Sequence, residues 1–153
     1  MNRNPKDIFF VVIQLILLVA YLFRLSKIDF AVSVWLQWIG LFFSFAGIVI
    51  SITSLLALNK NLSPFPTPKP GAELIQSGIY KYTRHPIYSS ILFFTFGFSL
   101  YSENTLRLII FFLLLILFRF KAIYEEKLLE DKYSNYDTYK KTTGMFLPKI
   151  KLR

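Results

Sequence analysis

The sequence contains long apolar runs, and these restrict the fold more than any other feature. Residues 8–23 are apolar except for Gln14, and residues 31–58 form a second run that is long enough to cross a bilayer at a tilt. Two further runs, 86–100 and 106–118, follow. With 54% hydrophobic residues in 153, the chain is too apolar for an ordinary soluble domain of this size. We therefore expect an all-α, polytopic membrane protein with about four transmembrane helices.

The four runs belong to a single domain over residues 1–153. Its predicted spans are approximately 8–25, 31–58, 86–101 and 105–129. The first run lacks a small-residue cleavage pattern after it, so we expect it to be retained. In the second span Gly40, Ser44 and Gly47 recur at near-helical spacing. They either let a neighbouring helix approach closely or are ordinary small residues of a span.

The basic residues indicate how these spans are oriented. The formal net charge is +9, and the basic residues lie between and after the apolar runs without a separate soluble domain to carry them. They therefore suit contacts with anionic headgroups, and we expect no nucleic acid partner. Most lie in the loop before the third span and from Arg119 onward. By the positive-inside rule, this loop, the C-terminal segment and both termini should be cytoplasmic, in the cell membrane of a prokaryote.

The loop before the third span has two parts. Residues 59–77, which we call the strap, carry four alternating prolines, and these favour either an extended chain or a plain linker. Residues 78–88 hold the only histidine, and the chain has no cysteine, so disulfides, cysteine nucleophiles and histidine-rich metal sites are excluded. Because Pro86 suits the first helical position, His85 should lie where the loop meets a helix.

Three charged residues, Arg84, Lys121 and Glu125, each have two interpretations. Arg84 beside the N–H groups of a helix start would favour an anion, or it only marks the cytoplasmic end of a span. Lys121 and Glu125 are four residues apart and so share a helix face, where they could be a solvated surface pair. A carboxylate just beyond an apolar helix otherwise needs a partner. The predicted topology brings Arg84 and Glu125 to the same face of the membrane.

Two motifs stand in a defined order and separation. The first is Ser77-Gly78-Ile79-Tyr80 followed by Arg84-His85-Pro86-Ile87-Tyr88, and the second is Glu125-Glu126 with Tyr136, Tyr139 and the closing Phe146-Leu147-Pro148. Together they resemble the hallmark segment and the C-terminal signature of the isoprenylcysteine carboxyl methyltransferase and phospholipid methyltransferase family of integral-membrane enzymes. The resemblance covers roughly residues 64–148.

This resemblance implies methyl transfer from S-adenosylmethionine. The cofactor pocket would be capped by a cytoplasmic loop, 64–88, and by an amphipathic C-terminal tail within 119–148. The residues that the resemblance places in the cofactor site are Leu74, Ile75, Tyr80, His85, Pro86, Ile87, Tyr88 and Glu125. Lys121 falls where related enzymes often have an arginine near the substrate. The chain departs from the family at Lys121, at Ser90 in place of a usual glycine, and in a tail one residue short before Tyr136.

The acceptor implied by the resemblance is a lipophilic small molecule or a membrane lipid, and the sequence leaves its class open. A carboxylate acceptor needs a cation such as Lys121 or Arg84 to orient it and needs no base. A lipid amine must lose a proton, for which Glu126 and His85 are the candidates. In both cases the enzyme mainly holds the methyl donor and the acceptor in the reactive orientation and excludes water from the site. The predicted catalytic residues are therefore Lys121, Arg84 and Glu126.

Two other functions compete with this interpretation. Sterol-reductase-like membrane enzymes that use NADPH have a similar arginine-histidine-proline segment, but typically with asparagine before the tyrosine and glutamate soon after it. Ile87 and Ser89-Ser90 in this chain argue against them. A non-catalytic membrane scaffold or lipid-binding protein would use Arg84 and Glu125 only as topology and solubility charges.

Overall fold

The computed structural model of the chain describes residues 4–23 and 29–149, apart from the side chain of Lys60. This described part is helical, with two isolated β-bridges, as the apolar periodicity predicts. The α-helices are α1 (Pro5–Leu22), α2 (Val34–Leu58), α3 (Pro86–Tyr101), α4 (Thr105–Lys132) and α5 (Tyr136–Thr142), and two short 3-10 helices cover Asn59–Asn61 and Gly78–Lys81. The end of the first predicted span, residues 24 and 25, lies outside the described residues.

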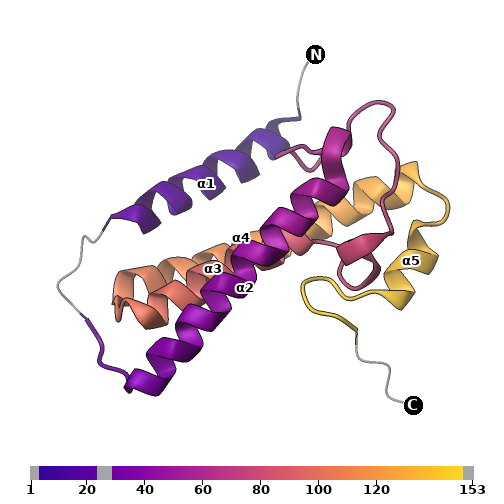
Figure 1. Cartoon of the computed structure of the whole chain (residues 1–153). Helices are drawn as coiled ribbons and strands as arrows, with labels where there is room; N and C mark the ends of the chain where they lie inside the picture. Colours follow the sequence, from indigo (N-terminus) through magenta and orange to yellow (C-terminus); the bar gives the residue numbers. More distant parts are fainter. Residues whose placement is uncertain (1–3, 24–28, 150–153) are drawn as a thin grey trace.

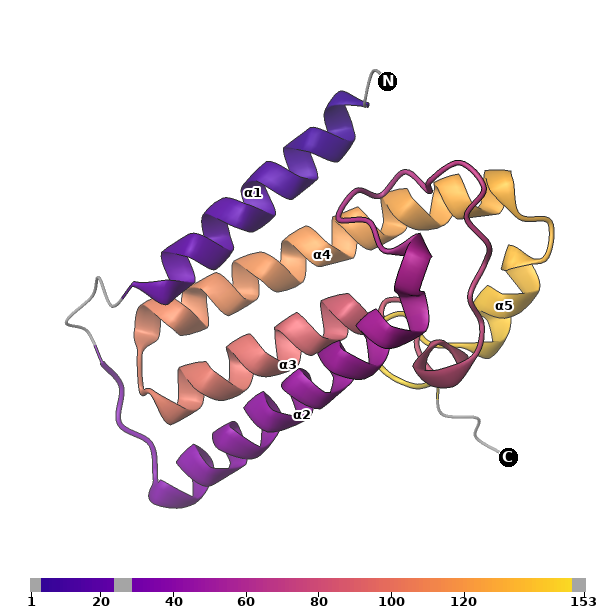
Figure 2. The same cartoon turned by 45° about the horizontal axis from the view of Figure 1, so that its top comes forward.

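The four long helices lie side by side in the order α1, α4, α3, α2 (Figures 1 and 2). The strap, the segment 78–88 and α5 gather at one end of them, around the C-terminal half of α4. The apolar core lies between α1, α3 and α4, where Leu114 and Phe118 are fully buried and Leu92 nearly so. This arrangement brings the two sequence motifs together although some 40 residues separate them.

Helix starts follow from capping residues that can be read in the sequence. The side chain of Asn4 accepts a hydrogen bond from the N–H of the second helical residue of α1, and Pro5 fills the first position. Asn104 caps α4 in the same way. His85 precedes Pro86, which begins α3, as predicted. His85 therefore lies at the N-terminus of α3, and its side chain is buried.

Small residues allow α2 and α3 to pack closely. A Cβ at Gly97 would lie 2.3 Å from the carbonyl oxygen of Gly40, and one at Gly47 would lie 2.7 Å from that of Ser90. Such distances exclude any larger side chain without a shift of backbone. Of the two interpretations of Gly40, Ser44 and Gly47, close helix approach is therefore correct. Ser90, which replaces the glycine usual in the family, is buried at this contact.

Two helices in the described part of the chain, α1 and α2, are long and apolar enough to cross a membrane by length and composition, with mean hydropathies of 1.9 and 2.3. Their large apolar side chains are mostly exposed, for example Trp35 at 80% and Leu56 at 75%. Apolar surface on this scale indicates association with a membrane. The apolar helix α3 is shorter, at 16 residues, and the apolar run of α4 ends before Arg119. Four transmembrane helices stay a prediction.

Candidate functional site

The segment 78–88 is fixed to the chain beyond α5 by backbone pairing. The N–H of Arg84 donates to the carbonyl of Gly144 at 2.9 Å, and the N–H of His85 donates to that of Met145 at 3.1 Å. The hydroxyl of Thr83 also donates to the Met145 carbonyl, at 2.7 Å. These bonds explain why the C-terminal segment returns to the helix ends after α5.

Arg84 and Glu126 form the charged centre of this junction. Arg84 Nε donates to Glu126 Oε1 at 2.8 Å, and the two side chains are only 7% and 2% exposed. Nη1 of the same guanidinium donates to the carbonyls of Lys140, at 3.1 Å, and Thr143. Lys140 Nζ lies 3.1 Å from the second oxygen of Glu126. One arginine therefore ties the loop before α3 to α4 and to α5.

The ionisation of Glu126 follows from these contacts. Burial alone would raise the pKa of its carboxyl group, but hydrogen bonds from His85 and Arg84 and their charges outweigh burial and lower the pKa to about 2. His85 Nε2 lies 3.2 Å from Glu126 Oε1. A carboxylate with so low a pKa is a poor proton acceptor. Glu126 and Arg84 together join the loop before α3 to α4 and α5, and their predicted catalytic roles stay a prediction.

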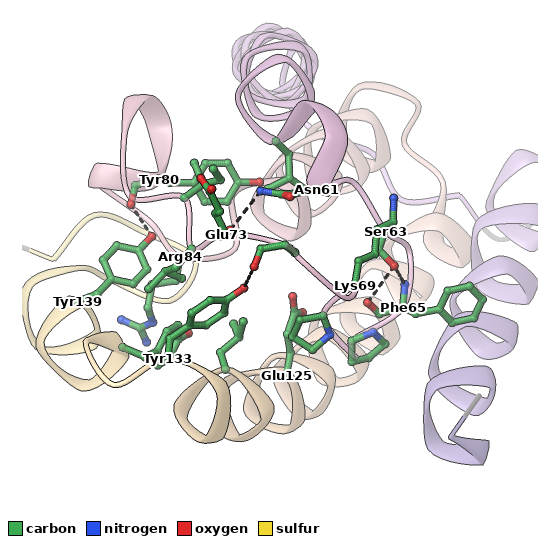
Figure 3. Close-up of a pocket in the computed structure, with 18 residues that line it drawn as sticks. Asn61, Ser63, Phe65, Lys69, Glu73, Tyr80, Arg84, Glu125, Tyr133 and Tyr139 are labelled. Atoms are coloured by element: carbon green, nitrogen blue, oxygen red, sulfur yellow. Dashed lines mark hydrogen bonds between the residues drawn. The ribbon is translucent and has the colours of Figure 1, made fainter. Parts of the chain in front are cut away.

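A first cavity, of about 110 Å³, lies between the strap, α4 and α5. Figure 3 shows Glu125 pointing into it from α4, with Tyr80 and Tyr139 at one side. The strap that covers it is fixed to the end of α4, where the hydroxyl of Tyr133 donates to the carbonyl of Ala72. Of the predicted cofactor residues, those that line this cavity are Leu74, Ile75, Tyr80 and Glu125, and Arg84 lines it as well.

A second cavity, of about 300 Å³, adjoins the first and faces α1. Tyr80, Arg84 and Glu125 line both cavities, so the two meet at these side chains. The other predicted residues that line the second cavity are His85, Pro86, Ile87, Tyr88 and Lys121. Ten of the eleven predicted site residues therefore line one or both of two adjoining cavities, and Glu126 lines neither.

An aromatic wall separates this space from the core. The ring of Tyr88 stacks between His85, at 5.3 Å between centroids, and Phe118, at 4.8 Å. Its hydroxyl donates to Glu125 Oε2 at 2.6 Å, and His85 Nδ1 lies 3.7 Å from the same oxygen. Glu125 is 24% exposed. A carboxylate held in this way against aromatic faces favours a cationic ligand.

Lys121 is buried, at 1% exposure, and so is not a solvated surface residue. Its Nζ donates to Gln14 Oε1 at 2.7 Å and to the carbonyl of Pro64 at 3.0 Å, and it lies 5.1 Å from the centroid of the Tyr88 ring. The sequence interpretation missed Gln14 as a site residue, although it lines the second cavity. The available signal was that Gln14 is the one polar residue in an otherwise apolar run.

Polar, charged cavities at the end of apolar helices suit a membrane-associated enzyme. The sequence matches the phospholipid methyltransferase family over residues 35–136, well over half of the chain, and the chain belongs to that family. It is therefore a methyltransferase that acts on lipid-like substrates. The sequence has no significant match among curated proteins. The matched segment begins within α2 and does not include α1.

Proposed function

We propose that the chain is an integral-membrane methyltransferase that uses S-adenosylmethionine and methylates a membrane-embedded acceptor at the cytoplasmic face. The observation that carries this proposal is the pair of cavities that meet at Tyr80, Arg84 and Glu125. One cavity is covered by the polar strap and α5, and the other faces α1. A polar donor and an apolar acceptor could thus meet at one point.

The residues around the first cavity fit the cofactor. When bound, S-adenosylmethionine supplies a methyl group on a positively charged sulfonium. Glu125 offers a carboxylate to that charge, because its side chain lines the cavity and its Oε2 accepts a bond from the neutral Tyr88 hydroxyl. Leu74 and Ile75 supply an apolar surface on the strap side. We assign the cofactor to these residues together with Tyr80, which lines both cavities. His85, Pro86, Ile87 and Tyr88 line the second cavity, so the bound cofactor would extend from the first cavity into the second.

The acceptor is assigned to the second cavity, where Lys121 is the cation. Two donors of its ammonium group bind neutral oxygens, of Gln14 and Pro64, so its charge is not cancelled by a direct ion pair among those described. A carboxylate or phosphate of the acceptor would be oriented by this charge. Arg84 is engaged by Glu126 and two carbonyls, and we therefore propose that it positions the loop. Proton removal from an amine acceptor falls to His85, because the oxygens of the other candidate, Glu126, are engaged by Arg84 and Lys140.

The same arrangement supports the proposed topology. In this topology α1 to α4 all cross the membrane, and α4 projects beyond it from Arg119. The N-terminus of α1, the strap and α5 lie at one end of the bundle (Figures 1 and 2). The described basic residues of the loop and of the C-terminal segment, among them Lys81 and Lys140, lie at that end, which the positive-inside rule assigns to the cytoplasm.

Binding of the methyl donor tests the proposal. Isothermal titration calorimetry on the full chain in detergent should detect S-adenosylmethionine binding, and Glu125→Gln should weaken it by about tenfold or more because a charge-assisted contact is lost. Asp131→Asn is the matched control, since Asp131 is an exposed carboxylate on the same helix. NADPH should not bind. Absence of donor binding to the wild type would overturn the proposal and leave a non-catalytic membrane protein.

The acceptor can be identified independently. Incubation of the protein with a radiolabelled methyl donor and whole membrane lipid extract should label a lipid fraction. The labelled group, an ester or an amine, then decides between the two acceptor classes. Label that stays in the aqueous phase would contradict a membrane-embedded acceptor.

A further inference from the structure

The hydroxyl of Tyr136 is a buried polar group without a hydrogen-bond partner among the described residues. Tyr136 is 1% exposed and belongs to the lining of the first cavity. A buried hydroxyl that lacks a partner costs about 1–3 kcal/mol of stability, so native structures usually satisfy such groups. A group that is left unsatisfied beside a cavity points to a ligand that completes it.

The neighbouring tyrosine of α5 shows that this is not a general property of the helix. Tyr139 is also buried and lines the same cavity, but its hydroxyl donates to the carbonyl of Tyr80 at 2.6 Å. The rings of Tyr136 and Tyr139 meet edge to face at 5.9 Å between centroids. The two side chains therefore have similar burial and packing, and they differ in whether the protein itself supplies a partner.

We infer that the Tyr136 hydroxyl is a binding group for the methyl donor, and that it donates a hydrogen bond to an oxygen of the bound donor. This inference rests on the proposed function, since it assumes that S-adenosylmethionine occupies the first cavity. The acceptor atom is an oxygen of the donor's carboxylate or of its ribose.

The surroundings of Tyr136 determine which partner it can take. Burial, followed by the charge of Glu126, raises the pKa of the Tyr136 phenol, with Arg84 opposing this. The hydroxyl therefore stays protonated and serves as a donor. Glu126 cannot take this bond as readily, because its oxygens already accept from Arg84, His85 and Lys140. The Tyr136 hydroxyl can therefore donate its hydrogen bond to an oxygen of a ligand in the cavity.

This assignment gives α5 a direct contact with the bound donor. The residues that the family resemblance places around the donor come from the strap, from residues 80–88 and from α4. Tyr136 would contact the donor from the C-terminal side, on a helix that Arg84 holds through the carbonyl of Lys140. Binding of the donor and docking of α5 are then coupled, because the ligand satisfies a group on the element that closes over it.

The inference predicts that removing the Tyr136 hydroxyl weakens binding of the methyl donor without lowering the stability of the ligand-free protein. Tyr136→Phe removes the unsatisfied hydroxyl, so the melting temperature of the ligand-free protein should equal or exceed that of the wild type. Its affinity for S-adenosylmethionine should fall by about 2–13-fold, the usual value of a hydrogen bond between neutral groups, and by more if the bonded oxygen is on the carboxylate. Tyr139→Phe, the matched control, should lower the ligand-free melting temperature because it leaves the Tyr80 carbonyl without its donor.

Calorimetry and thermal unfolding of the full chain in detergent give both readouts. Wild-type protein that does not bind S-adenosylmethionine would overturn the proposed function. Wild-type binding with unchanged affinity in Tyr136→Phe would overturn only the inference, as would a fall in its ligand-free melting temperature to the level of Tyr139→Phe. 5′-Methylthioadenosine, which lacks the carboxylate, locates the contact. If Tyr136→Phe weakens its binding equally, the bonded oxygen is on the ribose, and otherwise it is on the carboxylate.

Discussion

Replacing Glu126 by glutamine separates a structural role of this carboxylate from a catalytic one. The carboxylate is 2% exposed and holds Arg84, at 2.8 Å, and Lys140, at 3.1 Å. Loss of one partner of a buried ion pair costs about 3–5 kcal/mol, because the other charge stays buried without compensation. Glutamine keeps one acceptor oxygen, so we expect the lower end of this range. In a chain of this length that loss corresponds to a melting temperature lower by about 6–12 °C.

The assay is thermal unfolding of ligand-free protein in detergent, followed by methyl transfer under conditions where the variant is folded. We expect Glu126→Gln to lose stability and to retain turnover. Asp137→Asn is the control, because its pair with Lys141 is exposed and surface pairs contribute about 0–1 kcal/mol. The double variant Arg84→Gln/Glu126→Gln should be more stable than the sum of the single losses predicts. A variant with wild-type melting temperature and no turnover would refute this reasoning and make Glu126 the proton acceptor.

The pH dependence of stability provides a second readout of the same contact. The pKa of Glu126 in the folded protein is about 2, below its ordinary value of 4.5. A carboxyl group with a lowered pKa stabilises the fold fully above its unfolded pKa, and this contribution is lost as the pH falls through the folded value. The difference in melting temperature between the wild type and Glu126→Gln should therefore be constant above about pH 5 and shrink between about pH 4.5 and 2.

Two further predictions concern α1 and the contact between α2 and α3. Gln14→Leu should raise the KM for the acceptor by about tenfold and leave cofactor affinity unchanged, because Lys121 loses an oxygen that fixes it at the α1 side of the cavity. Steady-state kinetics and calorimetry measure these two quantities, with Thr53→Val as the control. A loss of cofactor affinity in Gln14→Leu would contradict the prediction. Gly97→Val should lower the melting temperature by about 5–10 °C, because its side chain would meet the Gly40 carbonyl, and a wild-type melting temperature would show that α2 and α3 can separate without cost.

Local rules accounted for much of the fold. Helix content followed from the apolar runs, and the start of α3 followed from His85-Pro86, because a proline fixes both its own φ and the conformation before it. The predicted second span began at Ala31, whereas α2 begins at Val34 after the N-cap Ser33. The Ser33 side chain makes no capping bond. The N–H groups of Phe30 and Val32 donate instead to Glu103, which holds these residues outside the helix, and apolar composition does not predict this long-range contact.

The contacts that build the site were harder to predict, since most join backbone groups or distant elements. The bonds from residues 84 and 85 to the carbonyls of Gly144 and Met145 involve main-chain atoms that every residue carries. No residue type marks such a pairing in a single sequence. Positive charge alone could not distinguish Arg84, which is buried against Glu126, from the exposed basic residues around it. The family resemblance identified Arg84 as part of a motif. Its bonds to Glu126 and to the carbonyls of Lys140 and Thr143 give a physical reason for an arginine at this position.

Lys121 and Glu125 carry opposite charges on α4, and the way each side chain is held bears on which acceptor the site selects. Glu125 and Lys121 are one helical turn apart and line the same cavity, yet Glu125 bonds to Tyr88 and Lys121 bonds to Gln14 and the strap. Each charge is thus held by a neutral partner and remains available to a ligand of opposite sign. Gln14 lies on α1, outside the segment 35–136 that matches the family. On the proposed function, the donor side of the site therefore follows the family motifs, whereas the acceptor side depends on a helix that the family match does not include.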